Sequence, residues 1–170
     1  MLTTIAVLVI LLGLMVSLAR RVRQGSAESV TTDLLRNLDV LMEQYKQRNR
    51  GALPVISPLV TDAETSPTEA SLQKRSLTNN RDLVRVLKAQ VDLSAGAFSR
   101  LPISIYDEAN LRDAWGTPIV FLPRFHRAIG MPPGGEYFFV SAGPDRKFLT
   151  RADNLYSYEA AVGERVEERK

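Results

Sequence analysis

The sequence predicts an α+β protein in which a long N-terminal helix packs on a small antiparallel sheet. Residues 2–19 form an apolar run without a single charge. Apolar residues then recur at helical spacing between residues 30 and 45. Two short runs of β-forming residues, 119–122 and 137–140, follow in the C-terminal half. Together these patterns indicate one long helix at the start of the chain and strands near its end.

The apolar run is long enough to cross a membrane. A helix over residues 2–19 would rise about 27 Å, close to the thickness of the hydrocarbon core of a bilayer. Arg20, Arg21 and Arg23 end the run abruptly. We therefore expect residues 1–25 to form a transmembrane anchor that is in contact with the lipid bilayer.

Two other interpretations of the apolar run remain open. A cleaved secretory signal would have a basic segment ahead of the run, and only Met1 stands there, although residues 17–19 (Ser-Leu-Ala) fit the small-x-small cleavage rule. A buried helix in a soluble core is the second alternative, but small domains rarely bury a helix that is apolar on every face.

Composition limits the function of the remaining chain. About 150 of the 170 residues follow the anchor, enough for one domain, which we place at residues 26–162 with a charged tail at 163–170. The net charge is only +3, and no basic stripe interleaved with aromatics suggests nucleic-acid binding. The absence of cysteine excludes disulfides, thiolate zinc sites and cysteine nucleophiles.

The first helix is expected to continue as an amphipathic segment to about residue 50. Gly51 can cap it, and Pro54 prevents its continuation. A break at Gly25 would instead give two separate helices. The predicted buried face consists of Val30, Leu34, Leu35, Leu38, Leu41, Met42 and Tyr45.

The middle of the chain is rich in serine, threonine and proline, so residues 57–78 are predicted to form an exposed loop. Thr78 or Asn80 would cap a second helix over residues 81–91, with Leu83, Val84, Leu87 and Val91 buried. Strands are predicted at 119–122 and 137–140, and a short third strand at 155–158 could complete the sheet.

No constellation of residues predicts catalysis. His126 is the only histidine, and no serine-nucleophile, phosphate-loop or dinucleotide-binding motif is present. The adjacent carboxylates of Asp107 and Glu108 would need different environments to act as an acid–base pair, which sequence does not show. We therefore expect a protein that is not an enzyme.

The segment 113–118 (Asp-Ala-Trp-Gly-Thr-Pro) predicts a structural turn. Asp113 can accept hydrogen bonds from the backbone amides of the turn, and Gly116 permits a positive φ. Pro118 would fix the entry into the next strand. Trp115, the only tryptophan, is expected to pack on the core of the sheet.

A second motif spans residues 141–145 (Ser-Ala-Gly-Pro-Asp) and 153–155 (Asp-Asn-Leu). Its carboxylates, hydroxyl and amide oxygen are the ligand types that Ca²⁺ prefers. The spacing is not that of an EF-hand, and three basic residues lie between the two parts. A hydrogen-bonded turn without metal therefore remains the alternative. The candidate ligands are Ser141, Asp145, Asp153 and Asn154.

Together these features resemble the type IV pilin superfamily, most closely the major pseudopilin of type II secretion systems. That family reads D-P-W-G-x-P, an aromatic strand, S-x-G-x-D-G and a D-D-I-like triplet, and this chain has DAWGTP, YFFVSAGPD and DNL at 113–118, 137–145 and 153–155. The resemblance implies a pilin-like fold whose long helix lies half in the membrane, and calcium bound through Ser141, Asp145 and Asp153. The chain departs from the pattern at Arg146, which replaces a glycine, and at Asn154, which replaces an aspartate.

The function implied by the resemblance is assembly into a pseudopilus or pilus-like filament. The expected partners are copies of the chain, other pilin-like subunits and an assembly platform in the bacterial inner membrane. The alternative is a single-pass membrane-tethered module that binds a ligand or partner and never polymerises. The flanking charges and the family resemblance predict opposite topologies. The arginines after the anchor favour a cytoplasmic domain, whereas the family resemblance implies a periplasmic domain. We expect the periplasmic location.

The start of the chain differs from the family. Prepilins begin with a basic leader, a glycine and F-T-L-x-E ahead of the apolar run, and the sequence from Met1 is similar to the family's segment after that glutamate. We expect the gene to encode an in-frame extension with these elements upstream of Met1. Cleavage and N-terminal methylation would follow if the leader exists.

Overall fold

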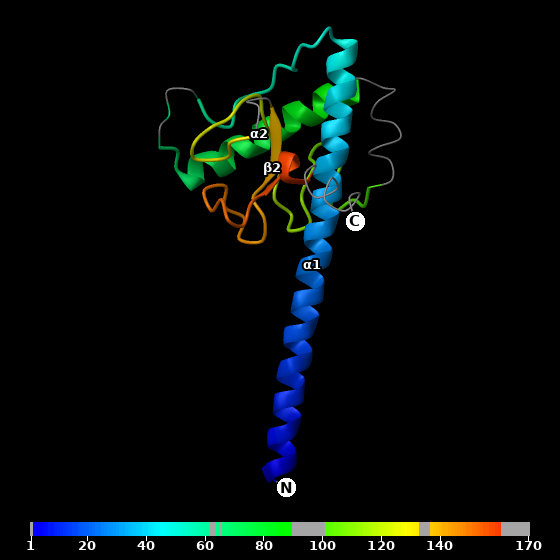
Figure 1. The fold of residues 1–170 in the computed structure, drawn as a ribbon, viewed down its shortest axis with the longest axis vertical. Coiled ribbons are helices and arrows are strands. Elements are labelled where there is room, and N and C mark those ends of the chain that lie inside the picture. Colours follow the sequence, from blue (N-terminus) through cyan, green and yellow to red (C-terminus); the bar gives the residue numbers. More distant parts are fainter. Residues whose placement is uncertain (1, 62–63, 65, 90–100, 133–136, 161–170) are drawn as a thin grey trace, which may run out of the picture.

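The computed structural model describes residues 2–61, 64, 66–89, 101–132 and 137–160, without the side chains of residues 2–14, 16 and 19–21. It has an α+β fold, as predicted, with a long N-terminal helix and a small antiparallel sheet. Figure 1 shows the other elements gathered around the upper half of the long helix, whose N-terminal half projects from them. The elements are α1 (Leu2–Arg48), α2 (Glu69–Ala89), β1 (Val120–Leu122), β2 (Phe138–Ser141) and β3 (Leu155–Tyr156).

Helix α1 is continuous over 47 residues and passes through Gly25, so the expected alternative of a break there is wrong. The predicted buried face of α1 is confirmed in the C-terminal half of the helix, where Leu34, Leu35, Leu38, Leu41 and Met42 are buried. Val30 is instead 47% exposed. The reason is that Thr31, about 100° further around the helix, faces the domain at this level.

The C-terminal end of α1 has the predicted glycine. Gly51 has a φ of 83°, and its amide donates to the carbonyl of Lys46 at 2.8 Å. A second left-handed residue, Arg50, precedes it with a φ of 57°. This bond satisfies one of the carbonyls that a helix end leaves unpaired.

Within the described part of the chain, no helical segment combines the length and the apolarity that a membrane span requires.

The exposed loop predicted at residues 57–78 is wrong, because α2 begins at Glu69. Thr68, and neither Thr78 nor Asn80, caps the helix, accepting a bond from the Ser71 amide at 3.4 Å. Leu72 is fully buried. The helical period was hidden in the sequence because the buried face of α2 continues through polar residues. That face consists of Leu72, Ser76, Asn79, Asn80, Leu83, Val84 and Leu87, and the predicted Val91 lies outside the described residues.

The three strands pair in the order β1-β2-β3, and both pairs are antiparallel. Val140 of β2 lies opposite Val120 on one side and Tyr156 on the other. The strands divide the core in two. Phe121 and Phe139 point toward α1 and α2, while the residues that alternate with them form a second cluster. The sequence predicted β3 over 155–158, but the strand ends at Tyr156 and a helical turn follows.

Two buried asparagines of α2 pair with the backbone beside β1. The Asn79 side chain accepts from the Phe121 amide at 2.8 Å and donates to its carbonyl at 2.9 Å. The Asn80 side chain accepts from the Leu111 amide at 2.9 Å and donates to the carbonyls of Leu111 and Ile119, at 2.7 and 2.6 Å. These amides therefore occupy the outer edge of β1 as a neighbouring strand would.

The upper part of α1 carries a carboxyl group beside the sheet. The Ser157 hydroxyl donates to Asp39 and accepts from the Phe139 amide at 3.2 Å. Burial is the largest cause that raises the pKa of Asp39 to about 6, and the nearby Glu43 adds to it. The folded protein therefore binds a proton at this carboxyl group more tightly than the unfolded chain does.

We expect the contribution of Asp39 to stability to be complete below about pH 4 and to be lost as the pH rises to about 6. The folded protein binds a proton in this range that the unfolded chain releases, so the loss is about 2–3 kcal/mol. The substitution Asp39→Asn should remove this dependence. Urea unfolding of both proteins between pH 4 and 7 measures it, and parallel curves would show that Asp39 titrates normally.

Candidate functional site

The two sequence motifs converge at one buried junction. The Ser141 hydroxyl, at the end of β2, donates to Oδ2 of Asp113 at 2.6 Å and accepts from the Gly143 amide at 3.1 Å. A Cβ atom added at Gly143 would lie 1.8 Å from the carbonyl oxygen of Asp153. The backbone of Gly143 therefore packs directly on the loop that precedes β3. We name the cluster Asp113, Ser141, Gly143 and Asp153 the motif junction.

The first motif forms a closed turn around Asp113. Oδ1 of Asp113 accepts from the amides of Trp115 at 3.0 Å and Thr117 at 2.8 Å. The Asp113 amide donates to the Thr117 carbonyl at 2.9 Å, and Gly116 has a φ of 86°. Pro118 lies two residues before β1 and forms an isolated bridge with Arg112. The carboxylate thus acts as the centre of the turn that leads into the sheet.

Helix α1 forms a hydrogen bond with this turn. The fully buried Thr31 hydroxyl accepts a bond from the Ala114 amide at 3.2 Å. The sequence did not predict this contact, because a threonine on an amphipathic helix gives no signal of a distant partner. The contact fixes where along α1 the turn, and with it the motif junction, is held.

Burial is the main influence on the Asp113 carboxyl group and raises its pKa. The bond from Ser141, the two turn amides and the charge of Arg146 act in the opposite direction. A buried carboxylate with several donors is a structural centre, since each donor offsets part of the cost of removing the charge from water.

Trp115 does not pack on the core of the sheet as predicted. It is half-buried, and among the described residues it belongs to neither core cluster. It lines a surface recess of about 250 Å³ between α1 and the loop before β3. The amides of Trp115 and Thr117 bind the Asp113 carboxylate, so the side chain that this turn buries is that of Asp113 and not that of Trp115. The recess is lined by Gln24, Glu28, Trp115, Pro144, Ala152, Asp153 and Leu155.

We accordingly expect Trp115→Ala to lower the free energy of unfolding by about 1–2 kcal/mol, less than the 3–5 kcal/mol typical of a fully buried aromatic. Thermal unfolding of the full chain in detergent measures this difference. Phe139→Ala, at a fully buried position of the same sheet, is the matched control for a core aromatic. Equal losses in the two variants would mean that Trp115 is part of the core.

The four residues expected to bind calcium do not form a free set of oxygens. Ser141 is fully buried and its hydroxyl already makes two bonds within the motif junction. Oδ1 of Asp145 accepts from the Lys147 amide at 2.9 Å. Asn154 donates to the Phe148 carbonyl at 2.8 Å, while its own buried Oδ1 has no partner. Asp153 is half-buried in the recess beside Trp115.

In this arrangement Ser141 and Asp145 each use a side-chain oxygen in hydrogen bonds within the loop. In the part of the chain that the structure describes, no three His, Cys, Asp or Glu side chains gather closely enough to hold a metal. Arg146 also contributes its positive charge close to Asp113. The geometry supports a loop held by hydrogen bonds and by the close packing of Gly143.

We expect the melting temperature of the full chain to be the same in millimolar calcium and in EDTA. A ligand that binds only the folded state would raise it by mass action. Asp145→Ala and Asp153→Ala serve as controls. A calcium-dependent rise that both variants abolish would contradict this expectation and establish the loop as a metal site.

His126 lies in the loop after β1 and forms an isolated bridge with Gly130. Its Nε2 is 3.1 Å from the Glu64 carbonyl, and its Nδ1 accepts from the Ala128 amide at 3.3 Å. A recess of about 260 Å³ lies beside it, formed by segments 58–61 and 122–126. Glu64 forms an ion pair with Arg75 of α2, which also donates to the Leu59 carbonyl. These contacts hold loops in place and involve no nucleophile.

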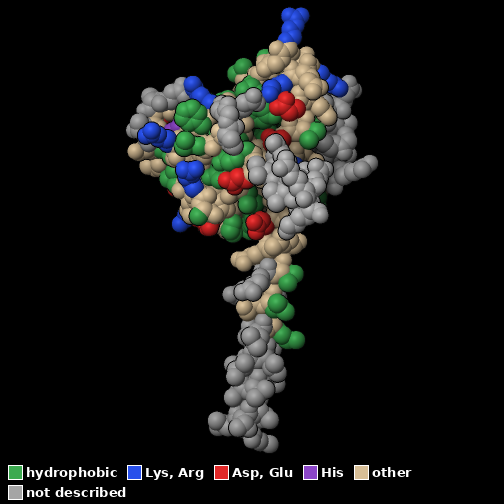
Figure 2. Space-filling view, in the orientation of Figure 1, with side chains coloured by type: hydrophobic (Ala, Val, Ile, Leu, Met, Phe, Trp, Pro, Cys, Tyr) green, Lys and Arg blue, Asp and Glu red, His purple; other side chains and the backbone are tan. Residues whose placement is uncertain are grey.

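The lower half of α1 presents a row of exposed apolar side chains. Met15, Leu18, Val22 and Val30 lie on one side of the helix and are 47–70% exposed. With Ala114 they line a shallow groove of about 730 Å³. Figure 2 shows apolar side chains along the projecting part of the helix below the domain. We name these four residues the apolar stripe.

No protein-family model, curated protein or solved structure matches this chain.

Proposed function

We propose that this protein is a pilin-like subunit, anchored in the bacterial inner membrane with its domain in the periplasm, that assembles into a pseudopilus of the type II secretion kind. The observation that carries the proposal is the motif junction. The residue patterns that resemble the pseudopilins, 113–118, 141–145 and 153–155, belong to three separate segments of the sequence and meet at one point of the fold. If the resemblance to the family pattern were a coincidence, there would be no reason for its three segments to be in contact in the fold.

The backbone at Arg146 is a second support. Arg146 has a φ of 61°, a conformation in which glycine is favoured, and the family pattern has glycine at this position. A backbone conformation that favours glycine, at the position where the family pattern has glycine, supports the proposal.

The apolar stripe suggests how such a subunit would assemble. Helices that leave a bilayer for a filament core exchange lipid contacts for helix–helix contacts of similar apolarity, so the loss of apolar contacts with lipid is largely offset. The continuous α1 would bring this stripe against neighbouring copies, and the globular domains would surround the core.

Cross-linking in native membranes tests this assembly. Because the chain has no cysteine, Leu18→Cys combined with Val30→Cys places two reactive groups on the stripe. A bifunctional maleimide should give a ladder of multimers. The control pair, Val55→Cys with Ile103→Cys, lies at exposed positions away from the stripe and should give little. A monomer, or one heteromeric band, would contradict the filament.

Cross-linking from further cysteines, placed beside the His126 recess, addresses the alternative of a membrane-tethered binding module that does not polymerise. The recess beside His126 is the observation in its favour, since it combines apolar walls from Leu59 and Leu122 with the exposed ring of Phe125. A single heteromeric band from cysteines near this recess, and none from the stripe, would favour that function.

A further inference from the structure

The loop between β2 and β3 brings basic side chains to the level at which the apolar part of α1 ends. Its residues Pro144 and Ala152 line a recess together with Gln24 and Glu28 of α1. Gln24 is five residues beyond Ala19, the last residue of the apolar run, which corresponds to about 7.5 Å along the helix axis. The loop therefore lies at the depth of a lipid headgroup layer if residues 2–19 span a membrane.

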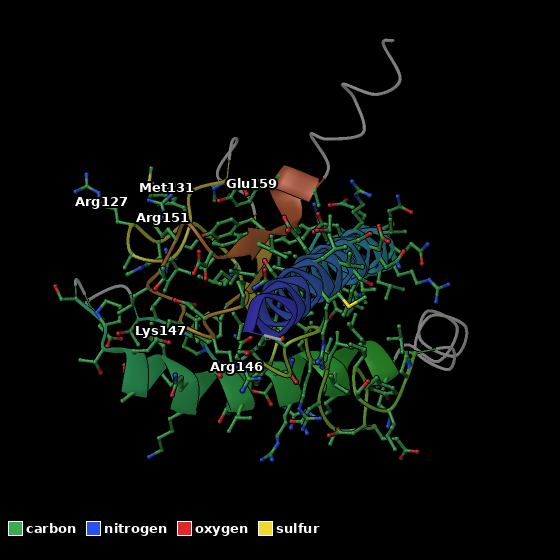
Figure 3. The ribbon with its side chains drawn as sticks, turned by 90° about the horizontal axis from the view of Figure 1, so that it is seen from below. Arg127, Met131, Arg146, Lys147, Arg151 and Glu159 are labelled. Carbon is green, nitrogen blue, oxygen red and sulfur yellow. The ribbon has the colours of Figure 1, made fainter. Side chains whose placement is uncertain are left out.

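This end of the domain carries exposed cations. Arg146, Lys147 and Arg151 of the loop are all exposed, and Arg23 of α1 is exposed at the same level. We name these four residues the basic collar. Figure 3, which views the domain from the side of the projecting helix, shows the three loop cations on this face. In the sequence, Arg20 and Arg21 precede Arg23 on the same helix.

The carboxylates described at this end are on the whole less exposed than these cations, and they include Glu69 of α2, which is half-buried and accepts from the Phe148 and Leu149 amides. Asp145 and Asp153 are half-buried, and Oδ1 of Asp145 already accepts from the Lys147 amide. Glu28 lines the recess beside α1, and Glu159 lies on the turn after β3. Two of these acids, Glu28 and Glu159, are exposed, against four exposed cations, so the exposed charge at this end is net positive.

We propose that the basic collar binds the headgroups of anionic phospholipids and seats the domain on the membrane from which α1 emerges. The inference rests on the proposed membrane anchoring of residues 2–19. Basic residues next to a membrane span are attracted to an anionic surface, and the attraction falls off within a Debye length of about 8 Å. Seating would hold the domain in one orientation before assembly, and leaving the membrane would require release of these contacts.

Trp115 provides a native probe of this seating. It is the only tryptophan and lies in the recess beside Pro144, Ala152 and Gln24, next to the basic collar. The full chain is reconstituted in vesicles of neutral brominated phosphatidylcholine, with or without about 30 mol % phosphatidylglycerol. We expect phosphatidylglycerol to raise the quenching of Trp115 fluorescence about twofold and about 0.5 M NaCl to reverse the increase.

Charge variants assign the effect to the collar. Arg146→Gln, Lys147→Gln and Arg151→Gln in combination should remove the response to phosphatidylglycerol, whereas Arg146→Lys with Arg151→Lys should retain it. The matched control replaces three exposed cations of α2, Lys74, Arg81 and Arg85, with glutamine and should leave the response intact. Melting temperatures of all variants establish that each is folded.

Flotation with neutral vesicles after an alkaline wash tests the membrane anchor separately from the binding of anionic lipid by the basic collar. A chain that floats but shows equal quenching with and without phosphatidylglycerol is anchored, and overturns only the lipid contact. A chain that does not float overturns the anchor and the lipid contact together. A response that persists in the triple glutamine variant, or disappears equally in the α2 control, also overturns the basic collar. An acidic protein would then be the partner to test.

Discussion

Gly143→Ala is expected to lower the free energy of unfolding by about 4 kcal/mol or more, or to prevent folding. The new methyl group would lie 1.8 Å from the Asp153 carbonyl oxygen, and the atom it meets is backbone, which cannot rotate away. The φ of 65° adds the strain of a left-handed residue with a side chain. Urea unfolding of the full chain in detergent measures the loss.

Gly116→Ala is the matched control. Gly116 also has a positive φ, of 86°, but a Cβ atom there would meet nothing within 4 Å. Only the backbone strain is added, so the loss should be about 1–2 kcal/mol. If both variants lose the same amount, the contact between Gly143 and Asp153 does not hold the motif junction together.

Asn80→Ala is expected to cost about 3–5 kcal/mol. The side chain is fully buried and makes three bonds of 2.6–2.9 Å to the backbone of Leu111 and Ile119. Its loss removes the bonds that Asn80 makes to the Leu111 amide and the Ile119 carbonyl in a buried site, while the Leu111 carbonyl keeps its bond from the Ile119 amide at 3.0 Å. Chemical unfolding at pH 7 measures the change.

Asn49→Ala is the control for Asn80. Asn49 is half-buried at the end of α1, and its side chain donates one bond to the Tyr45 carbonyl at 2.9 Å. Water can satisfy that carbonyl, so the loss should stay below about 1 kcal/mol. Similar losses at the two positions would mean that the α2 asparagines do not support β1.

The sequence predicted the elements whose hydrophobic period is regular. The upper half of α1 and the aromatic strands 120–122 and 138–141 appear where their apolar residues place them. It failed for the first half of α2, because the buried positions of that helix include Ser76, Asn79 and Asn80. These side chains are buried by bonds to distant backbone, which a local pattern does not contain.

The candidate site was predicted in its residues but not in its geometry. The sequence singled out Asp113 and Ser141 in separate motifs, and the bond between them depends on how β1 and β2 pair. It placed Trp115 on the core of the sheet as the aromatic anchor of the turn, but the side chain that the turn buries is Asp113. It gave no signal for Thr31, whose partner lies 83 residues away. Contacts of this kind follow from the assembled fold and not from spacing.

Electron microscopy of material sheared from the native cells tests the central claim that this chain is a filament subunit. We expect filaments that antibodies against the domain label along their length. Val22→Asp with Val30→Asp, which place charges on the part of the apolar stripe that follows the apolar run, should abolish them and leave the folded domain in the membrane fraction. A wild-type chain found only as a membrane-bound monomer, with no labelled filament, would contradict the proposed function.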